Sequence, residues 1–242
     1  MTRVIATALV VGLSVLTFGA LRAQTVDEII ARNLAARGGA ERLRAIQTQR
    51  LVGRISFGAD PAMPIMVEIK RPGRMRNEIV VDQKAIVRVT DGNSGWALNP
   101  LAGDSAPRPL TADELGNMAG GADLEGPLLD YVAKGNLIEL IGKDSVEGRP
   151  AWKLKVTLPS GEVRYDYVDA ESWLETKREG SIRNAGKPQD VESYFSDYRP
   201  VNGVMISWLI ASSTPGTAYT HRIVFDSVAV DQAIDDTRFS LP

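Results

Sequence analysis

Apolar and polar residues alternate along most of this chain, which is the pattern of half-buried β-strands. Ile65, Val67 and Ile69 share one parity, and Glu68 and Lys70 take the other. Residues two apart in a strand point to the same face of a sheet, so the first set should be buried and the second should face solvent. The same alternation predicts strands at 51–57, 65–70, 75–81, 85–89, 96–98, 152–158, 163–167, 173–179, 191–198, 204–211 and 219–230.

A helical spacing of apolar residues replaces this alternation near the start of the chain. Thr25 and Glu28 form a capping box, which predicts that a helix begins there. Gly38-Gly39 should end this helix, because glycine readily takes the left-handed conformation past a helix terminus. A short second helix is expected at 40–45, and the pair should pack against one edge or end of the sheet.

Residues 111–134 form a second region with helical spacing, and it too opens with a capping box. Two apolar stripes follow, one starting at Leu115 and the other at Leu124, with Gly120-Gly121 between them. We expect two short helices here. The glycines and Pro127 should make the segment easy to deform.

The predicted strands are joined by short turns, of which Asn202-Gly203 is a strong hairpin signal. Consecutive strands joined in this way form a mostly antiparallel meander. We therefore predict an α+β fold class, with one long curved sheet and helices packed on its concave side. Residues 24–242 should form a single domain, because no linker, low-complexity tract or fixed-period repeat interrupts them.

The first 23 residues have the pattern of a secretory signal peptide. A short positive stretch at 1–3 precedes a nearly continuous apolar run at 4–18, and small residues lead to Ala23. The apolar run is shorter than the ~20 residues that a membrane span requires. We expect cleavage near Ala23 and a mature protein in the periplasm.

Charge and composition exclude several classes of site. The chain has 242 residues, with 28 Lys and Arg against 30 Asp and Glu, so it has no net basic field for nucleic acid. It has no cysteine, which rules out disulfides, thiolate metal sites and cysteine nucleophiles. His221 is the single histidine, and its place on a predicted strand favours a half-exposed structural role.

Candidate catalytic chemistry is sparse. A serine hydrolase would need His221 as its base, yet no serine lies in a Gly-x-Ser-x-Gly sequence. The carboxylate pairs Asp166 with Asp169 and Asp235 with Asp236 fall in turns or on faces that parity places toward solvent. We therefore predict that the protein is not an enzyme and holds no metal or cofactor.

One charged residue is placed against the pattern. Arg71 continues the parity of Ile65, Val67 and Ile69, so it should point to the apolar face. A buried guanidinium needs hydrogen-bond acceptors, which makes the identity of its partner the central functional question.

Several short motifs occur in a fixed order around this arginine. They are Lys70-Arg71-Pro72, then Asp91-Gly92, Trp96 and Asn99-Pro100, and finally the closing segment 236–242. In these motifs and in its order of elements, the chain resembles the outer-membrane lipoprotein-sorting protein family, the LolA-like periplasmic lipoprotein carrier superfamily. The motifs cover about the central third of the mature chain and its last residues.

The resemblance implies a fold and an activity. The fold is an incomplete antiparallel β-barrel, or half-barrel, with helices as a lid over its apolar mouth. The activity is to hold the acyl chains of lipoproteins or other amphiphiles in transit toward the outer membrane. In this chain the lid would be residues 111–134, and Arg71 would latch it through hydrogen bonds to lid carbonyls.

The residues that would line the ligand cavity are apolar and come from the predicted strands and from the lid. They are Ile65, Val67, Ile69, Met75, Ile79, Trp96, Leu98, Leu115, Met118, Leu128 and Leu129.

Two other functions remain open on the sequence. The first is a sensory or regulatory interaction module on the same fold, of the envelope-stress type. The second is a periplasmic enzyme that uses a carboxylate pair. For the carrier, the expected partners are acyl chains of lipoproteins or another amphiphilic lipid, a membrane donor complex and an outer-membrane acceptor. We expect no nucleic-acid partner and a monomer.

Overall fold

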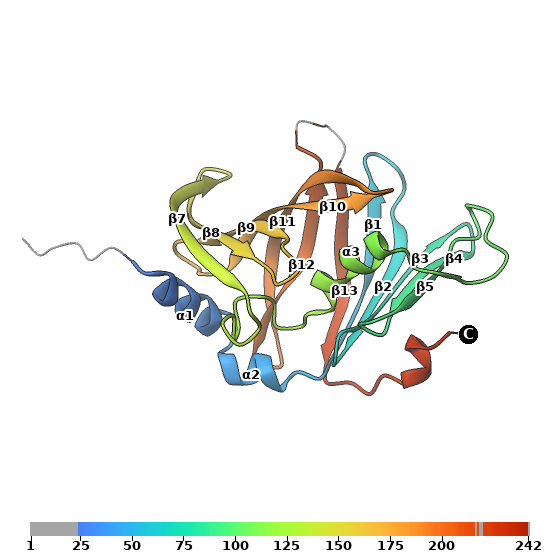
Figure 1. The fold of residues 1–242 in the computed structure, drawn as a ribbon, viewed down its shortest axis with the longest axis horizontal. Helices are drawn as coiled ribbons and strands as arrows, with labels where there is room; N and C mark the ends of the chain where they lie inside the picture. Colours follow the sequence, from blue (N-terminus) through green and yellow to red (C-terminus); the bar gives the residue numbers. More distant parts are fainter. Residues whose placement is uncertain (1–23, 216, 218–219, 242) are drawn as a thin grey trace, which may run out of the picture.

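One continuous antiparallel sheet dominates the structure, a computed structural model that describes residues 24–215, 217 and 220–241 (Figure 1). Within that part of the chain, thirteen strands follow the order β6-β5-β4-β3-β2-β1-β13-β12-β11-β10-β9-β8-β7. The sheet is strongly curved, but its edge strands β6 and β7 do not pair with each other (Figure 1). The barrel is therefore left open, which is the half-barrel that was predicted. The expected signal peptide, 1–23, lies outside the described residues.

The strands have the following bounds. They are β1 Thr48–Phe57, β2 Met63–Lys70, β3 Arg74–Val81, β4 Lys84–Thr90, β5 Gly95–Leu98, β6 Arg108–Pro109, β7 Leu137–Val146, β8 Arg149–Thr157, β9 Val163–Asp169, β10 Glu175–Asn184, β11 Lys187–Val201, β12 Val204–Ser213 and β13 Thr220–Val230. The alternation missed β7, which is largely exposed along its length because it is an edge strand.

The topology places the connection between β6 and β7 across the mouth of the half-barrel. The chain starts near the middle of the sheet at β1 and runs outward to the edge strand β6. It resumes at the opposite edge with β7 and returns strand by strand until β13 pairs with β1. The lid segment, which we define as residues 111–134, is therefore a crossover between the two edges.

Helices α1 (Val26–Ala36) and α2 (Ala40–Ala45) have the predicted bounds and lie together at one end of the half-barrel (Figure 1). The predicted capping box of α1 is present, with Thr25 accepting from the backbone of Glu28. Ile29 and Ile30 of α1 are buried against strands β7 to β9, and Leu43 of α2 is buried against β12 and β13.

The lid segment contains one helix rather than the two expected. Helix α3 (Ala112–Ala122) continues through Gly120-Gly121, and residues 123–135 then form turns. Gly126 and Gly135 take positive φ in these turns, a conformation that glycine allows at no steric cost. The apolar spacing from Leu124 to Val132 predicts a helix, but in the structure Leu128 packs beside α1 and Leu129 beside α2.

The concave face of strands β1, β2 and β3 carries the largest apolar core. Cross-strand pairs place Leu51, Val67 and Ile69 on this face. Trp96 and Leu98 were expected to line the same face, and that prediction is wrong. Ala97, their neighbour in β5, belongs to the concave core, whereas they pack on the outer face with Val87 and Val89.

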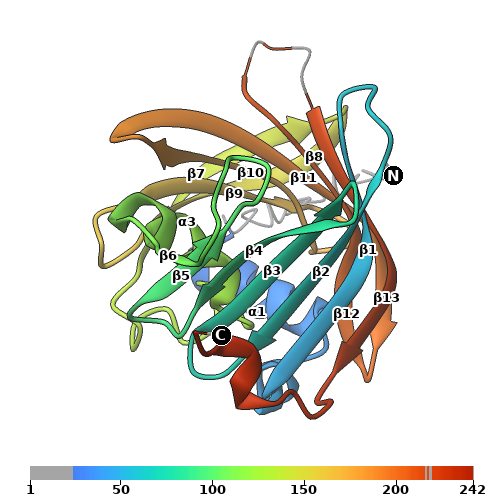
Figure 2. The same cartoon turned by 90° about the vertical axis from the view of Figure 1, so that its right-hand side faces the viewer.

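The outer face of strands β3, β4 and β5 is partly covered by the C-terminal segment. The short helix η1 (Asp236–Phe239) lies against β3, and Phe239 is buried with Trp96 (Figure 2). Glu68 points to this outer face, as parity predicted, but it is fully buried instead of solvent-exposed. Arg50 and Arg238 both donate to its carboxylate.

Strand β9 has the opposite orientation to the one predicted. Alternate residues of β9 face the concave side, because their cross-strand partners on β8 face inward. The pairs are Arg164 with Val156, Asp166 with Leu154, and Val168 with Trp152. Asp166 is therefore buried and not a solvated surface charge.

The tyrosines of β9 face outward instead. Tyr165 and Tyr167 lie beside Lys153, whose ammonium nitrogen is 4.7 and 4.8 Å from the two ring centroids. Asp169 was also predicted to be solvated, but it is buried. Its carboxylate accepts hydrogen bonds from the backbone N–H groups of Glu171 and Ser172 and so caps the turn after β9.

Two further observations concern classes of site. Among the described residues, no helix is long and apolar enough to cross a membrane, and no cluster of side chains could hold a metal ion. His221 lies half-buried on β13, with its ring centroid 5.5 Å from that of Phe57.

Candidate functional site

Helix α3 covers the apolar concave face. Met118 and Ala122 of α3 are buried in the same core as Met75, Ile65 and Val67, and Leu115 packs against that core. The approach is close at Gly121, where an added Cβ would lie 3.1 Å from the Met75 sulfur. The concave face of β1, β2 and β3 is therefore covered by α3 in this structure.

The opposite side of α3 is held by polar contacts to the hairpin of β10 and β11. The Asn117 amide donates to the Arg183 carbonyl at 2.7 Å and accepts from the Arg183 backbone N–H at 3.0 Å. The Gly186 N–H donates to the Asp113 carboxylate at 2.6 Å. Helix α3 thus connects the two halves of the sheet, by apolar packing on one side and hydrogen bonds on the other.

The start of α3 is fixed by Glu114, which completes the predicted capping box with Thr111. Arg108, from the edge strand β6, donates two hydrogen bonds to the same carboxylate at 2.7 and 2.9 Å. These hydrogen bonds lower the pKa of Glu114 from 4.5 to about 2. The ionised form is therefore the one that holds the helix terminus in place.

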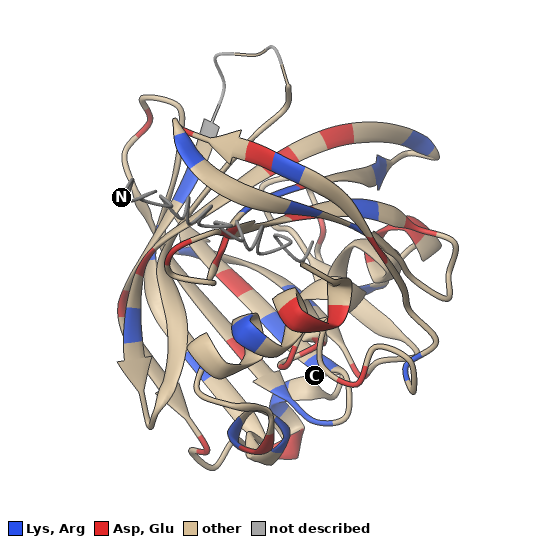
Figure 3. Ribbon diagram, turned by 90° about the vertical axis from the view of Figure 1, so that its left-hand side faces the viewer, with Lys and Arg blue, Asp and Glu red and all other residues tan. Residues whose placement is uncertain are grey.

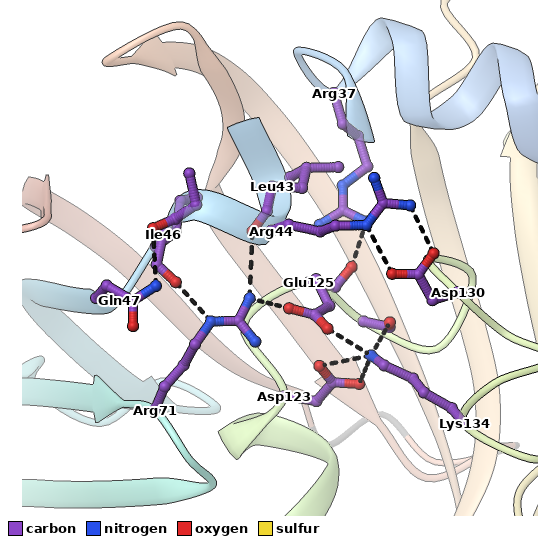
Figure 4. A network of polar contacts seen from close by, with 12 residues as sticks. Arg37, Leu43, Arg44, Ile46, Gln47, Arg71, Asp123, Glu125, Asp130 and Lys134 are labelled. Atoms are coloured by element: carbon purple, nitrogen blue, oxygen red, sulfur yellow. Dashed lines mark hydrogen bonds and ion pairs between the residues drawn. The ribbon is translucent and has the colours of Figure 1, made fainter. Parts of the chain in front are cut away.

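Arg71, at the end of β2, makes the contacts that close the mouth near α2 (Figure 4). Its guanidinium donates to the Ile46 carbonyl at 2.6 Å and to the Leu43 carbonyl at 3.2 Å, both at the C-terminal end of α2. It also pairs with the Glu125 carboxylate. The inward orientation agrees with the parity argument. The expected lid carbonyls are replaced by carbonyls of α2 and by one lid carboxylate.

Glu125 is the centre of this network (Figure 4). Its side chain is only 10% exposed, and Lys134 lies 3.1 Å from its second carboxylate oxygen. Its backbone carbonyl accepts from Arg37, which follows α1, at 2.7 Å. Lys134 also binds Asp123 at 2.9 Å. One buried carboxylate thus links the lid segment to β2, and its backbone links the lid to α1.

A separate ion pair joins α2 to the lid at the surface. Arg44 donates two hydrogen bonds to Asp130, at 2.6 and 2.7 Å. The two side chains are 50% and 39% exposed, so solvent screens the pair and its net contribution is small. This pair resembles the Arg71 pair in chemistry but lacks its burial.

Hollow space remains beside Arg71. A cavity of about 350 Å³ lies between α3 and the turns that follow β2 and β4. Arg71, Leu115, Ala122 and Lys134 contribute to its walls. A second cavity of about 190 Å³ lies deeper, between α1, the lid segment and strands β9 to β12.

The predicted lining residues separate into three locations. Those in or against the concave core under α3 are Ile65, Val67, Ile69, Met75, Ile79, Leu115 and Met118. Leu128 and Leu129 belong to the cores beside α1 and α2, and Trp96 and Leu98 lie on the outer face.

Sequence reasoning missed Glu125, Asn117 and Arg37. Glu125 had only a partial signal, because it is a carboxylate next to Leu124 in an apolar stripe, but Asp123 and Asp130 occur in the same stretch. Asn117 and Arg37 had no such signal, because polar residues are common at exposed positions of a helix.

Comparisons with known proteins identify the fold. No protein-family model and no curated protein sequence matches the chain. A crystal structure of a LolA superfamily protein from Nitrosomonas europaea aligns at a TM-score of 0.59 with 13% identity, over 90% of this chain and 98% of that one. A putative outer membrane lipoprotein-sorting protein domain from Vibrio parahaemolyticus aligns at 0.58 with 11% identity, over 88% and 94%. A DUF1329 family protein from Desulfovibrio piger aligns at 0.60 with 14% identity, over 87% and 95%.

Proposed function

From the LolA-like fold of this chain, we propose that the protein is a periplasmic carrier of amphiphiles. It binds the acyl chains of lipoproteins or other lipids on the concave face of the half-barrel and delivers them toward the outer membrane. The predicted signal peptide supports the compartment, and residues 24–242 act as one domain. The names of the related structures, which include a lipoprotein-sorting domain, support the class of cargo.

One observation carries the proposal. A continuous apolar face is covered by a helix that packs on it through apolar side chains and is held on its outer side, and beyond its C-terminal end, by polar contacts. Apolar surface in water costs about 25 cal/mol per Å², so the empty carrier needs such a cover. Polar contacts to backbone and side chains can be exchanged for water at a low net cost, so the cover can be removed.

The mechanism is an exchange of two apolar occupants. In the closed state α3 contacts the concave core through Leu115, Met118 and Ala122. An acyl chain that takes this place gains ~0.8 kcal/mol for each CH₂ that it buries. The latch contacts of Arg71 oppose the exchange, so they set how readily cargo is accepted and handed on. A partner at either membrane would supply any further driving force.

Native mass spectrometry of the mature protein, purified from its own periplasm, tests the proposal. Acylated molecules that remain bound would support a carrier, and their masses would identify the cargo. A strictly empty protein that also fails to bind an apolar dye would contradict it.

The edge strand β7 favours a second candidate, an interaction module. Leu137 and Ile141 are 58% and 54% exposed on a strand with one unpaired edge. An unpaired edge is a template for a strand from another protein. A variant Ile141→Lys separates the two functions, because it should abolish binding of a protein partner and leave dye binding unchanged.

A further inference from the structure

The deeper cavity, of about 190 Å³, is partly open to solvent and is lined by several charged side chains. Its volume is far above the ~10–15 Å³ that one water molecule requires. Arg164 and Asp166 of β9, Glu175 and Arg178 of β10, and Arg37 after α1 all contribute to the lining. Carrier chemistry based on acyl chains alone gives no reason for such a cluster.

Arg164 has hydrogen-bonding capacity that the protein does not use. The residue is 5% exposed, and its Nη2 donates to Asp166 at 3.0 Å. Its Nε is buried and has no hydrogen-bond partner among the described residues. Asn33 of α1, 1% exposed and also at the cavity, has an unpartnered side-chain oxygen. The Oδ1 atom of Asp166 is likewise buried without a hydrogen-bond partner among the described residues. Buried polar atoms are normally satisfied, so these three atoms point to a ligand or to solvent in the cavity.

The other two arginines are also only partly used. Arg178 donates to both oxygens of Glu175 at 2.9 Å, and its Nε lies 3.5 Å from Asp166. Arg37 donates one side-chain hydrogen bond, to the Glu125 carbonyl. Each guanidinium has five N–H groups, so the cluster holds more donors than the surrounding acceptors take up.

The charges around the cavity favour an anion. Basic and acidic residues both occur along the strands of the sheet (Figure 3). At the cavity, three guanidinium groups face the carboxylates of Asp166 and Glu175. Asp123 also lines the cavity, but its carboxylate is bound by Lys134. One positive charge is therefore left over. Arginine pairs strongly with planar or tetrahedral oxyanions, because its donors match the geometry of carboxylate and phosphate.

We propose that this cavity binds the anionic headgroup, a carboxylate or a phosphate, of the carried amphiphile, with Arg164 as the principal donor. This inference rests on the carrier function and specifies the class of cargo. Leu124 and Ile206 line the cavity and also pack against the concave core, so a headgroup held here places its chain beside that core. The cargo is then a lipid with one oxyanion at its end and a chain that replaces α3.

Access from solvent runs beneath α3. A groove of about 590 Å³ lies between α3, the turn after β8 and strand β10. Arg164, Gly120 and Asp123 line both this groove and the deeper cavity. Space is open where a side chain on Gly120 or Gly116 would project. Gly116 lines the groove but not the deeper cavity, whereas Gly120 lines both. The two glycines therefore form a matched pair for substitution.

The test compares ligands that share a chain and differ in the headgroup. Oleate and oleyl alcohol displace a neutral apolar dye from the mature protein, and their affinities are measured at one ionic strength. We expect oleate to bind at least about tenfold more tightly than oleyl alcohol, because one hydrogen bond to a charged group corresponds to about that ratio of dissociation constants. Inorganic phosphate should compete with oleate and leave the alcohol unaffected.

Two variants assign the preference to the cavity. Arg164→Met should reduce the oleate-to-alcohol ratio to about one, whereas Arg44→Met, at the exposed pair, should preserve it. Gly120→Leu fills the cavity without removing a charge and should also abolish the preference. Gly116→Leu should preserve it. If Arg164→Met fails to fold, the two glycine variants still decide the question.

Failure of this inference is distinct from failure of the carrier function. Equal affinities for oleate and oleyl alcohol in the wild type would overturn the headgroup site and leave the carrier intact. Phosphate binding combined with equal lipid affinities would assign the cavity to a free anion and also overturn the proposal. If neither lipid displaces the dye, the carrier function itself is contradicted.

Discussion

The guanidinium of Arg71 is paired with the carboxylate of Glu125, so the end of strand β2 is joined to the lid segment by one partly buried ion pair. Arg71 also holds two carbonyls at the end of α2, which places the helix, the strand and the lid in a single network. Removing one partner of a buried pair leaves a charge without compensation, which makes this contact a sensitive point for substitution.

Arg71→Leu should increase opening of the lid. Lys134 stays close to Glu125 and compensates in part, so we expect a loss of roughly 1–3 kcal/mol in the free energy that closes the lid. Hydrogen exchange of the α3 backbone amides measures this directly, and an apolar dye should bind more tightly. Arg44→Leu is the matched control, since its pair with Asp130 is exposed. Unchanged exchange in both variants would show that Arg71 is not a latch.

Asn117→Ala should loosen α3 from the other half of the sheet. The variant loses two hydrogen bonds to the Arg183 backbone, which together contribute about 1–2 kcal/mol. Exchange of the α3 amides should accelerate, while the thermal midpoint of the whole domain changes little. Asn184→Ala, an exposed position on the same hairpin, serves as the control. A fall in global stability without faster exchange in α3 would argue against a separable lid.

Glu114 should make stability depend on pH in the acidic range. Its folded pKa of about 2 lies below the ordinary value of 4.5, so its contribution is complete above pH 4.5. The contribution is lost as the pH falls from 4.5 toward 2, where the folded carboxylate also takes up a proton. We expect Glu114→Gln to cost about 1 kcal/mol at neutral pH.

Chemical denaturation of the wild type and Glu114→Gln across this range measures the effect. The difference in unfolding free energy should shrink as the pH is lowered. A difference that stays constant with pH would mean that the ionised carboxylate does not hold the start of α3.

Glu68→Gln should destabilise the domain without affecting the lid. Glu68 is fully buried on the outer face between Arg50 and Arg238, and loss of its charge leaves two cations facing each other. We expect a loss of ~3–5 kcal/mol in unfolding free energy, measured with denaturant. Glu78→Gln, at a more exposed carboxylate of the same cluster, should cost less. Equal losses in the two variants would contradict the role of burial.

The sequence predicted most of the strands and the direction of Arg71, because both depend on a period of two that the sheet enforces, but it missed β6 and β7. It misplaced Trp96, since an outer face covered by η1 is as apolar as an inner one. It reversed β9 for a related reason. Aromatic rings can pack with lysines on an outer face, and charged groups can pair around a cavity, so polarity alone does not identify the buried side.

The site was predicted less completely than the fold. Arg71 was found because it breaks a pattern, but its partner Glu125 is distant in sequence and becomes a neighbour only through the crossover from β6 to β7. Leu128 and Leu129 follow a helical spacing, yet the turns around Gly126 direct them to α1 and α2. Contacts that depend on chain topology are not encoded in local periodicity.

The crossover that carries α3 has a thermodynamic consequence. Residues 110–136 join β6 to β7 at opposite edges of the sheet, so the lid is tethered at both ends and stays beside the concave face after it opens. The lid therefore competes with any ligand for the concave face, as a tethered part of the same molecule. Its effective concentration is set by the length of the tether and does not fall on dilution. Under the proposed carrier function, the apparent affinity for cargo is then the intrinsic affinity multiplied by the open fraction. A change in the latch rescales the affinity for every cargo by the same factor and leaves the preference among cargoes unaltered.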